Sequence, residues 1–197
     1  MFLSSRHSDL SIRYIYSAEF ILFFLYKMKR VSIFGKKNTD ALHPERQAKR
    51  SATENWPNQD YIFDSAQQVN IVNQLWMDQQ FAGCENVRRE IANKLSGYRN
   101  QDKRKGLFDS DTFISYADLM DKLVVSRLRC YYCRTPLLVA YQNVRDKNQW
   151  TLDRLDNNIG HSNQNTVVAG LECNLRRRKI DDKKFLFTRQ MRLIKKN

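Results

Sequence analysis

The stretch CYYCRTPLLVAYQNVRDKNQWTLDRLDNNIGHSNQNTVVAGLECNLRRRK, residues 130–179, contains the patterns that decide the fold. Within it, Gln149–Leu155 (QWTLDRL) alternates apolar and polar side chains, which is typical of a half-buried strand. A loop rich in Asn and Gly separates it from Thr166–Leu171 (TVVAGL), a second strand-like run, and the residues from Glu172 onward favour a helix. The apolar run Leu137–Tyr141 predicts one more short strand. The order, a hairpin followed by a helix, predicts an α+β domain.

Upstream of this stretch the apolar residues recur every three or four positions, which predicts helices. Ser65 and Gln68 form a capping-box pattern that opens the first helix, and Gly97 is the predicted stop of the second. We therefore expect a helical region over residues 61–129, followed by a separate domain over 130–197. The predicted segments of the helical region are a helix from Ser65 to about Phe81, a helix from about Glu85 to Gly97, a basic loop over 99–106 and a helix over about 113–128.

Residues 1–60 are predicted to be an N-terminal segment and a linker. Tyr14–Tyr26 (YIYSAEFILFFLY) is strongly apolar, but its 13 residues are too few to cross a bilayer, so no stable membrane insertion is expected. Three interpretations stay open for it: a buried or interfacial helix, an anchor on a membrane surface, or a non-native part of residues 1–27 because translation starts at Met28. Residues 35–60 are polar and have no period, which favours a flexible linker.

The chain has a net charge of +13 and a pI near 9.7, which implies an anionic partner, nucleic acid before an acidic membrane surface. Residues 174–197 hold ten Lys or Arg and only two acids, so much of the excess lies there. Within this region we predict a basic helix over about 181–195, with apolar contacts from Phe185, Leu186, Met191 and Ile194.

The chain has four cysteines: Cys84, Cys130, Cys133 and Cys173. Because no credible secretory signal precedes them, we expect an intracellular, reducing compartment and no disulfide framework. A Cys-x-x-Cys pair with a distant third cysteine suits a metal site or redox chemistry better.

Four features converge in residues 130–179: the knuckle CYYC, the strand WTLDRLDN (150–157), the loop GHSNQN (160–165) and the helix start CNLRRRK (173–179). Together they resemble the HNH endonucleases, also called ββα-metal nucleases. The closer branch has zinc-knuckle cysteines, as in recombination endonuclease VII, and similar strings occur in HNH-like proteins of large DNA viruses. A weaker echo extends back to about residue 91. The resemblance implies a zinc-stapled ββα-metal domain that hydrolyses phosphodiester bonds in DNA, in the nucleus or a viral factory.

The resemblance also implies roles for single residues. Asp153 corresponds to the carboxylate ligand of a catalytic Mg²⁺ or Mn²⁺, and Asn174 to its amide ligand. Asn165 corresponds to the middle Asn of the signature, which braces the loop. A hard cation with few protein ligands suits this chemistry, because Mg²⁺ prefers oxygen donors and retains several waters. Cys130, Cys133 and Cys173 are the implied ligands of a structural zinc.

The sequence departs from the family pattern at two positions. Arg154 stands where the family usually has the histidine that acts as general base, which leaves the base unassigned. His161 is our first candidate because imidazole titrates near neutral pH, Asp156 is the second, and Arg154 is expected to pair with a phosphate. Gly170 stands where a fourth zinc cysteine belongs, so Cys84, His161 and water remain candidates for the fourth ligand, with a degraded zinc site as a further alternative. The predicted phosphate contacts on the following helix are Arg176, Arg177, Arg178 and Lys179.

Two other functions stay open. The protein could be a catalytically inactive HNH-fold module that only binds nucleic acid, with Arg154 and Gly170 as signs of lost chemistry. It could also be a protein held at a membrane surface by residues 14–26. Whether a nuclease would cut a specific site, a branched DNA or any DNA is not decided by the sequence, and a homodimer is compatible with cleavage of both strands.

Overall fold

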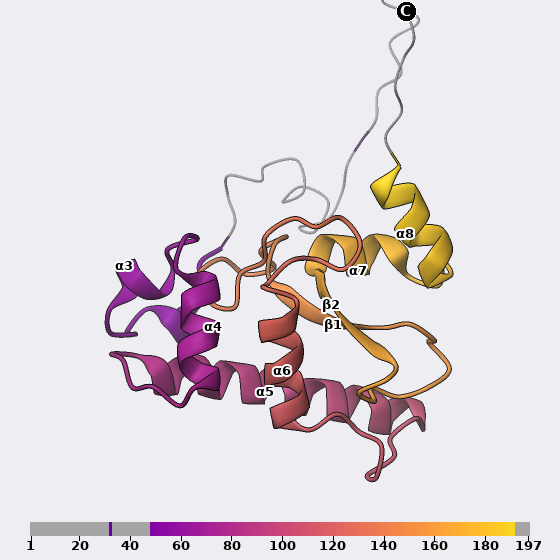
Figure 1. The fold of residues 1–197 in the computed structure, drawn as a ribbon, viewed down its shortest axis with the longest axis horizontal. Helices are drawn as coiled ribbons and strands as arrows, with labels where there is room; N and C mark the ends of the chain where they lie inside the picture. The colour runs from indigo at the N-terminus through magenta and orange to yellow at the C-terminus, as the bar shows by residue number, and fades with distance from the viewer. Residues whose placement is uncertain (1–31, 33–47, 192–197) are drawn as a thin grey trace, which may run out of the picture. The chain divides into compact units, whose positions relative to one another are not determined.

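The computed structural model describes residue 32 and residues 48–191, and the account below concerns the unit that begins at Gln47 (Figure 1). The apolar segment Tyr14–Tyr26 and the alternative start Met28 lie outside the described residues. Helices surround one small sheet, which confirms the predicted α+β class. No helix in the described part is long and apolar enough to cross a membrane. The elements are η2 (Ser51–Thr53), α3 (Gln59–Ile62), α4 (Gln68–Trp76), α5 (Cys84–Lys105), α6 (Tyr116–Val125), β1 (Trp150–Arg154), β2 (Thr166–Gly170), α7 (Leu171–Arg177) and α8 (Asp182–Gln190).

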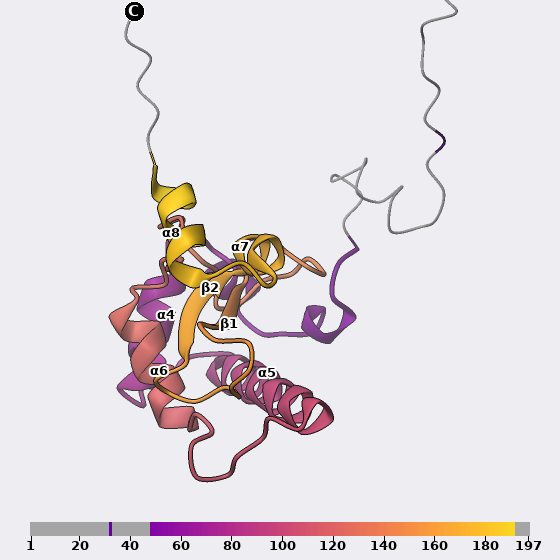
Figure 2. The same cartoon turned by 90° about the vertical axis from the view of Figure 1, so that its right-hand side faces the viewer.

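The hairpin β1–β2 is antiparallel and lies between α5 on one side and α7 with α8 on the other, as Figures 1 and 2 both show. Trp150 pairs with Gly170 and Arg154 with Thr166, but the half-buried strand that the alternation predicts is not observed. Every residue of β1 is buried, because helices cover both of its faces. Helix α7 follows β2 without a loop, which places the hairpin and the helix as the sequence predicts.

Helix α5 is longer than predicted. The predicted stop at Gly97 and the predicted loop over 99–106 are both wrong, because α5 continues to Lys105 and ends at Gly106, whose φ is +67°. A glycine inside a helix costs about 1 kcal/mol relative to alanine. Burial of Leu95 on one side of Gly97, and the hydrogen bonds of the buried Asp102 to His161 on the other, offset this cost.

Helix α4 begins at Gln68, and the predicted capping box between Ser65 and Gln68 does not form. The Gln68 side chain is buried and points elsewhere: its Nε2 donates to Ile62 O (2.9 Å) and Asp64 O (3.0 Å). Its Oε1 accepts from Val139 N (2.9 Å) and Ala140 N (3.0 Å). The backbone N–H groups of Val139 and Ala140 therefore bond to a side chain and not to a neighbouring strand. The predicted strand over 137–141 is wrong: only an isolated bridge at Leu138 forms there.

The remaining helices differ from prediction mainly at their ends. Helix α6 is shorter than the predicted 113–128 and starts at a capping box formed by Ser115 and Asp118. Helix α8 is capped by the side chain of Asp181 and is shorter than the predicted 181–195. Phe185 is buried and Leu186 packs against the core as predicted, whereas Met191 is half-exposed and Ile194 lies outside the described residues.

Residues 48–60, which the sequence analysis placed in a linker, lie against the loop before β1. Arg50 N donates to Gln142 O (2.7 Å), and the Arg50 guanidinium contacts Tyr141 and pairs with Glu90 of α5. Phe185, Trp150 and the helices of the 61–129 region contribute to one buried cluster. The helical region and the hairpin region therefore share a core.

Replacing Gln68 with alanine is expected to lower the free energy of unfolding by about 2–4 kcal/mol, because two buried amides and two carbonyls lose a partner. Urea denaturation followed by circular dichroism measures the change. Gln79→Ala, at an exposed position one turn beyond the end of α4, is the control and should stay within about 0.5 kcal/mol of wild type. Equal stabilities of the two variants would contradict this account of Gln68.

Candidate metal and nucleic-acid site

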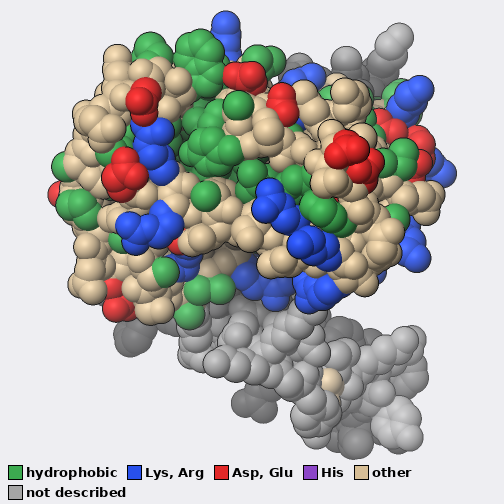
Figure 3. All heavy atoms as spheres, turned by 90° about the horizontal axis from the view of Figure 1, so that it is seen from below, with side chains coloured by type: hydrophobic (Ala, Val, Ile, Leu, Met, Phe, Trp, Pro, Cys, Tyr) green, Lys and Arg blue, Asp and Glu red, His purple; other side chains and the backbone are tan. Residues whose placement is uncertain are grey.

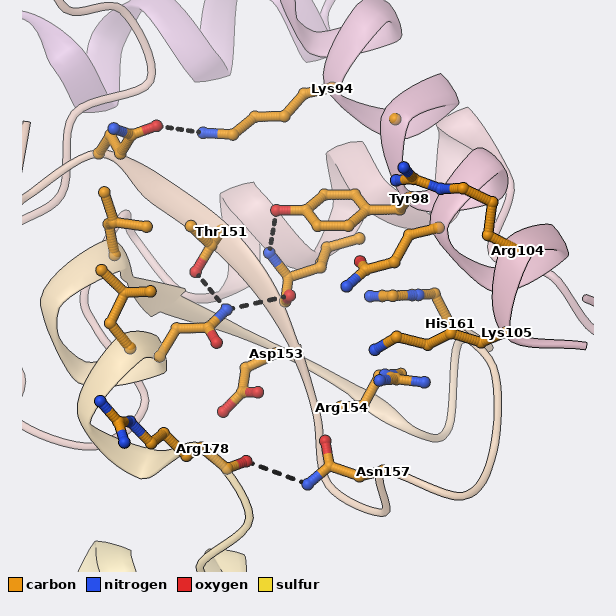
Figure 4. Close-up of a pocket in the computed structure, with 17 residues that line it drawn as sticks. Lys94, Tyr98, Arg104, Lys105, Thr151, Asp153, Arg154, Asn157, His161 and Arg178 are labelled. Carbon is orange, nitrogen blue, oxygen red and sulfur yellow. Dashed lines mark hydrogen bonds between the residues drawn. The ribbon is translucent and has the colours of Figure 1, made fainter. Parts of the chain in front are cut away.

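Five of the residues that the sequence singles out line a hollow of about 540 Å³ between α5, β1 and α7: Asp153, Arg154, His161, Asn174 and Arg178 (Figure 4). Helix α5 forms one wall with side chains three or four positions apart, which places them on one face. Strand β1 forms the floor and contributes Asp153. The lining residues that carry polar groups include Lys94, Tyr98, Gln101, Arg104, Lys105, Thr151, Asp153, Arg154, Asn157, His161, Asn174 and Arg178.

Asp153 is buried on β1 and is held from two sides. Tyr132 Oη donates to its Oδ2 (2.7 Å), and Arg177 Nη1 donates to its Oδ1 (3.0 Å). In Figure 4 the carboxylate points into the hollow. Burial raises the pKa of Asp153, while Tyr132 and Arg177 act in the opposite direction. Each carboxylate oxygen has two lone-pair directions, so Oδ1 retains one that its single donor does not use.

Asn174, in the middle of α7, lines the same hollow. Its Nδ2 donates to Thr151 Oγ1 (3.1 Å) and Leu152 O (3.4 Å), and Thr151 Oγ1 in turn donates to Ala169 O (2.8 Å). These contacts fix the orientation of the Asn174 amide, because its Nδ2 donates to β1. Its Oδ1 has no hydrogen-bond partner among the described residues. The structure thus brings the predicted pair, Asp153 and Asn174, to one hollow with an oxygen of each available. Two such oxygens with room for water fit the preference of Mg²⁺ or Mn²⁺.

His161 is buried and paired with a carboxylate that the sequence analysis did not select. Its Nδ1 lies 2.8 Å from Asp102 Oδ1, and its backbone N donates to Asp102 Oδ2 (2.7 Å). The imidazole packs against Tyr98 at a centroid distance of 4.7 Å. Burial lowers the pKa of His161, and Asp102 partly reverses this effect. An Nδ1–H donated to Asp102 leaves the lone pair on Nε2, in a side chain that lines the hollow.

Arg154, Asp156 and Asn165 have structural contacts in the loop after β1. Arg154 Nη1 donates to Ile159 O (3.1 Å) and lies 3.8 Å from Asp102, and its side chain is only 7% exposed, which limits the predicted phosphate contact. The Asp156 carboxylate accepts from Asn158 N (2.8 Å) and caps a turn. Asn165 braces the loop as expected, since Oδ1 accepts from Asp156 N (2.8 Å) and Nδ2 donates to Asp156 O, Ile159 O and Gly160 O.

The four basic residues of the predicted phosphate-binding run do not all face the same way. Arg177 is buried, because it lies one turn after the buried Cys173, and its guanidinium bonds Asp153 and Leu155 O (2.6 Å). Its predicted phosphate contact is therefore corrected to an internal ion pair. Arg176 is exposed and pairs with Glu172 (3.1 Å). Arg178 and Lys179 are exposed and line a second hollow of about 940 Å³.

The two hollows adjoin each other. Lys105, Arg154, Asn157 and Arg178 line both of them. Between them, Asn157 Nδ2 donates to Arg178 O (3.1 Å) and holds a backbone with φ of +50°, which is unusual for a residue with a side chain. The last turn of α5 adds Lys103, Arg104 and Lys105. Figure 3, which looks onto the α5 side of the molecule, shows Lys and Arg side chains gathered there.

Cys130, Cys133 and Cys173 form a cluster whose sulfur atoms all lie within 4.8 Å of one another. The hydrogen bond from Gly170 N to Cys130 Sγ (3.4 Å) further orients the set. The neighbouring Cys173 thiol lowers the pKa of Cys130 to about 5, and the Cys130 sulfur raises that of Cys173. Three converging sulfurs with one stabilised thiolate suit a soft or borderline cation such as Zn²⁺.

No fourth protein ligand joins the cluster in the described part of the chain. The Cys84 thiol, at the start of α5, donates to Oε1 of Gln80 in the segment before this helix (3.0 Å). His161 is paired with Asp102. Of the three candidates from the sequence, water is the one compatible with this geometry. Arg189 of α8 lies beside Cys133 and Cys173.

Sequence reasoning missed Asp102, Tyr98, Tyr132 and Lys94. The first two belong to residues 98–102 of α5, where the expected stop at Gly97 concealed an i, i+4 pair on one helix face. Tyr98 Oη accepts from Leu152 N (2.9 Å) at the open edge of β1. Lys94 donates to Gln149 Oε1 (3.1 Å) and to Trp150 O, and burial lowers its pKa to about 7.

Replacing Asp102 with asparagine is expected to lower the pKa of His161 further, because the carboxylate that favours the imidazolium is removed. Titration of the ring protons by NMR measures this, and the chain has only three histidines to assign. The exposed Asp111→Asn is the control and should leave the titration unchanged. A His161 pKa that is equal in wild type and Asp102→Asn would refute the pairing.

Purified protein is expected to contain about one zinc ion per chain, and Cys173→Ser should lose it. Elemental analysis after exhaustive dialysis gives the stoichiometry, and Co²⁺ substitution gives the charge-transfer bands of thiolate ligands. Cys84→Ser is a matched control, since this cysteine is also buried but lies outside the cluster. Zinc-free wild-type protein, or loss of zinc from Cys84→Ser, would rule out the assignment.

The hollow thus combines a carboxylate, an amide and a buried imidazole with several Lys and Arg side chains on its lining. No family model, curated protein or solved structure matches this chain. The resemblance of residues 130–179 to the HNH endonucleases stays a prediction.

Proposed function

We propose that the protein is a metal-dependent endonuclease of the HNH type that hydrolyses phosphodiester bonds in DNA. The observation that carries this proposal is that Asp153, Asn174 and His161 line one hollow bordered by cations, with His161 held by the buried Asp102. The hairpin β1–β2 and helix α7 supply the first two, in the order that a ββα-metal motif requires.

Asp153 and Asn174 are the residues that would hold the catalytic Mg²⁺ or Mn²⁺. When bound, such an ion stabilises the charge that develops on the phosphate and on the leaving oxygen. The chain's own contribution is to fix both ligand oxygens before the ion arrives. Arg177 and Tyr132 fix the carboxylate, and Thr151 fixes the amide.

His161 is the proposed general base. Because burial favours the neutral imidazole, Nε2 is ready to accept a proton from water at neutral pH. Asp102 holds the tautomer that leaves Nε2 free and stabilises the imidazolium that forms on proton transfer. Asp156, the second candidate, already caps a turn and is less suited to the role.

Lys105, Arg178 and Lys179 are the proposed phosphate contacts. They are exposed and extend from the first hollow into the second, so one nucleic-acid strand can cross the Asn157–Arg178 contact and place successive phosphates in both. Phosphate contacts of this kind give affinity without base recognition and make binding weaken with salt. A structural zinc on the three cysteines would brace the knuckle beside β1.

A non-catalytic nucleic-acid-binding module is the second candidate. It is favoured by the contacts of Asp153, whose carboxylate accepts hydrogen bonds from both Arg177 and Tyr132. In that case the ion pair serves stability alone, and the cations around the hollows account for the whole function.

The test is incubation of purified protein with plasmid and branched DNA, with Mg²⁺ and with EDTA. Asp153→Asn keeps the shape of the side chain and should abolish metal-dependent cleavage. His161→Gln should reduce the single-turnover rate by about 10²–10⁴-fold. Lys183→Ala, on α8 and outside both hollows, is the control and should cleave as wild type does. Salt-sensitive DNA binding without any cleavage would replace the nuclease with the binding module.

A further inference from the structure

Tyr132 connects the cysteine cluster to the carboxylate at the hollow. It lies inside the Cys-x-x-Cys knuckle, directly before Cys133, and its side chain is completely buried. Its hydroxyl donates to Asp153 Oδ2 at 2.7 Å. The path from a sulfur of the cluster to the proposed ligand of the catalytic ion is therefore one residue and one hydrogen bond long.

The position of the Tyr132 ring is set by the knuckle and its neighbours. Tyr131 N donates to Val168 O (2.9 Å) on β2, and Arg134 N closes the knuckle onto Cys130 O (3.0 Å). The ring of Tyr132 packs edge-on against Phe185 of α8 at 4.9 Å. Its backbone carbonyl accepts from Gln190 Nε2 (3.1 Å). A change in the conformation of the knuckle must therefore move the hydroxyl.

Among the described residues, the hydroxyl is one of two side-chain anchors of the Asp153 carboxylate. Arg177 binds mainly Oδ1 from α7, and Tyr132 binds Oδ2 from the knuckle. Two anchors on different oxygens fix the plane of a carboxylate, whereas one anchor lets it rotate. Partners of this kind commonly change the metal affinity of a ligand by 10–100-fold.

We propose that Tyr132 is a positioning residue through which the occupancy of the cysteine cluster sets the affinity of Asp153 for its divalent ion. This inference rests on the proposed function. Zinc at Cys130, Cys133 and Cys173 holds the knuckle, the knuckle holds the Tyr132 hydroxyl, and the hydroxyl holds the carboxylate in the orientation that receives the ion.

The adjacent tyrosine offers a matched control. Tyr131 is in the same knuckle and stacks edge-on with Tyr132 at 5.1 Å, but its hydroxyl has no hydrogen-bond partner among the described residues. Tyr132→Phe and Tyr131→Phe each remove one oxygen and keep the ring. Only the first removes an anchor of Asp153.

The experiment measures Mn²⁺ binding by electron paramagnetic resonance, with the Mg²⁺ dependence of cleavage as a second readout. At equal zinc content, Tyr132→Phe should bind Mn²⁺ about 10-fold more weakly and need correspondingly more Mg²⁺, with little change in the rate at saturating metal. Tyr131→Phe should match wild type. Equal Mn²⁺ affinity of Tyr132→Phe and wild type would overturn the proposal.

Removal of zinc with a chelator tests the link to the cluster. Zinc-free wild type should lose Mn²⁺ affinity, and zinc-free Tyr132→Phe should lose no more than the substitution alone, because both changes act through one hydroxyl. Additive losses would overturn the coupling. If wild type binds Mn²⁺ and cleaves DNA but both Tyr132 tests fail, the proposed nuclease function stands and only this inference is overturned. If wild type binds no Mn²⁺, the proposed nuclease function and this inference are overturned together.

Discussion

The buried ion pair between Asp153 on β1 and Arg177 on α7 is the contact on which the site depends. Both side chains are almost completely excluded from water, and removal of one partner from such a pair typically costs about 3–5 kcal/mol because the other charge stays buried. Tyr132 donates a further hydrogen bond to the Asp153 carboxylate, and Arg177 Nη2 donates to Leu155 O. By fixing α7 against the hairpin, the pair also fixes Asn174, which lies one turn earlier on the same helix.

Helix α5 is the second constraint, because the hairpin alone forms only the floor of the hollow. Tyr98 satisfies an edge amide of β1, Lys94 a carbonyl of the same strand, and Asp102 holds the loop that follows it. One face of one helix therefore makes three contacts with the 150–161 region. A site built in this way is not contained in residues 130–179, and its geometry depends on the helical region that precedes them.

The sequence predicted the parts of the fold that depend on local pattern. Alternation located β1, and the short apolar run over 166–171 located β2. The resemblance to the HNH pattern selected Asp153 and Asn174, which line one hollow, and the Cys-x-x-Cys spacing selected cysteines that lie together. The remaining features, such as the end of α5 and the contacts of Gln68 and Arg177, depend on which side chains are buried. Gly97 stops a helix only if its flanks gain nothing from continuing, and Gln68 caps a helix only if no buried amides compete for it. Arg177 resembles its exposed neighbours in sequence, but its position one turn after Cys173 places it inside.

The replacement of the expected histidine by Arg154 and the use of His161 are linked through one carboxylate. Asp102 lies 2.8 Å from His161 Nδ1 and 3.8 Å from Arg154 Nη1, so it is shared by both. A free carboxylate would favour the imidazolium, whereas the arginine neutralises it and itself opposes a second positive charge. The imidazole then stays neutral while its Nδ1–H remains anchored. Burial is the largest cause of the lowered pKa of His161, and Arg154 adds to it, which favours the neutral imidazole that the proposed general base requires.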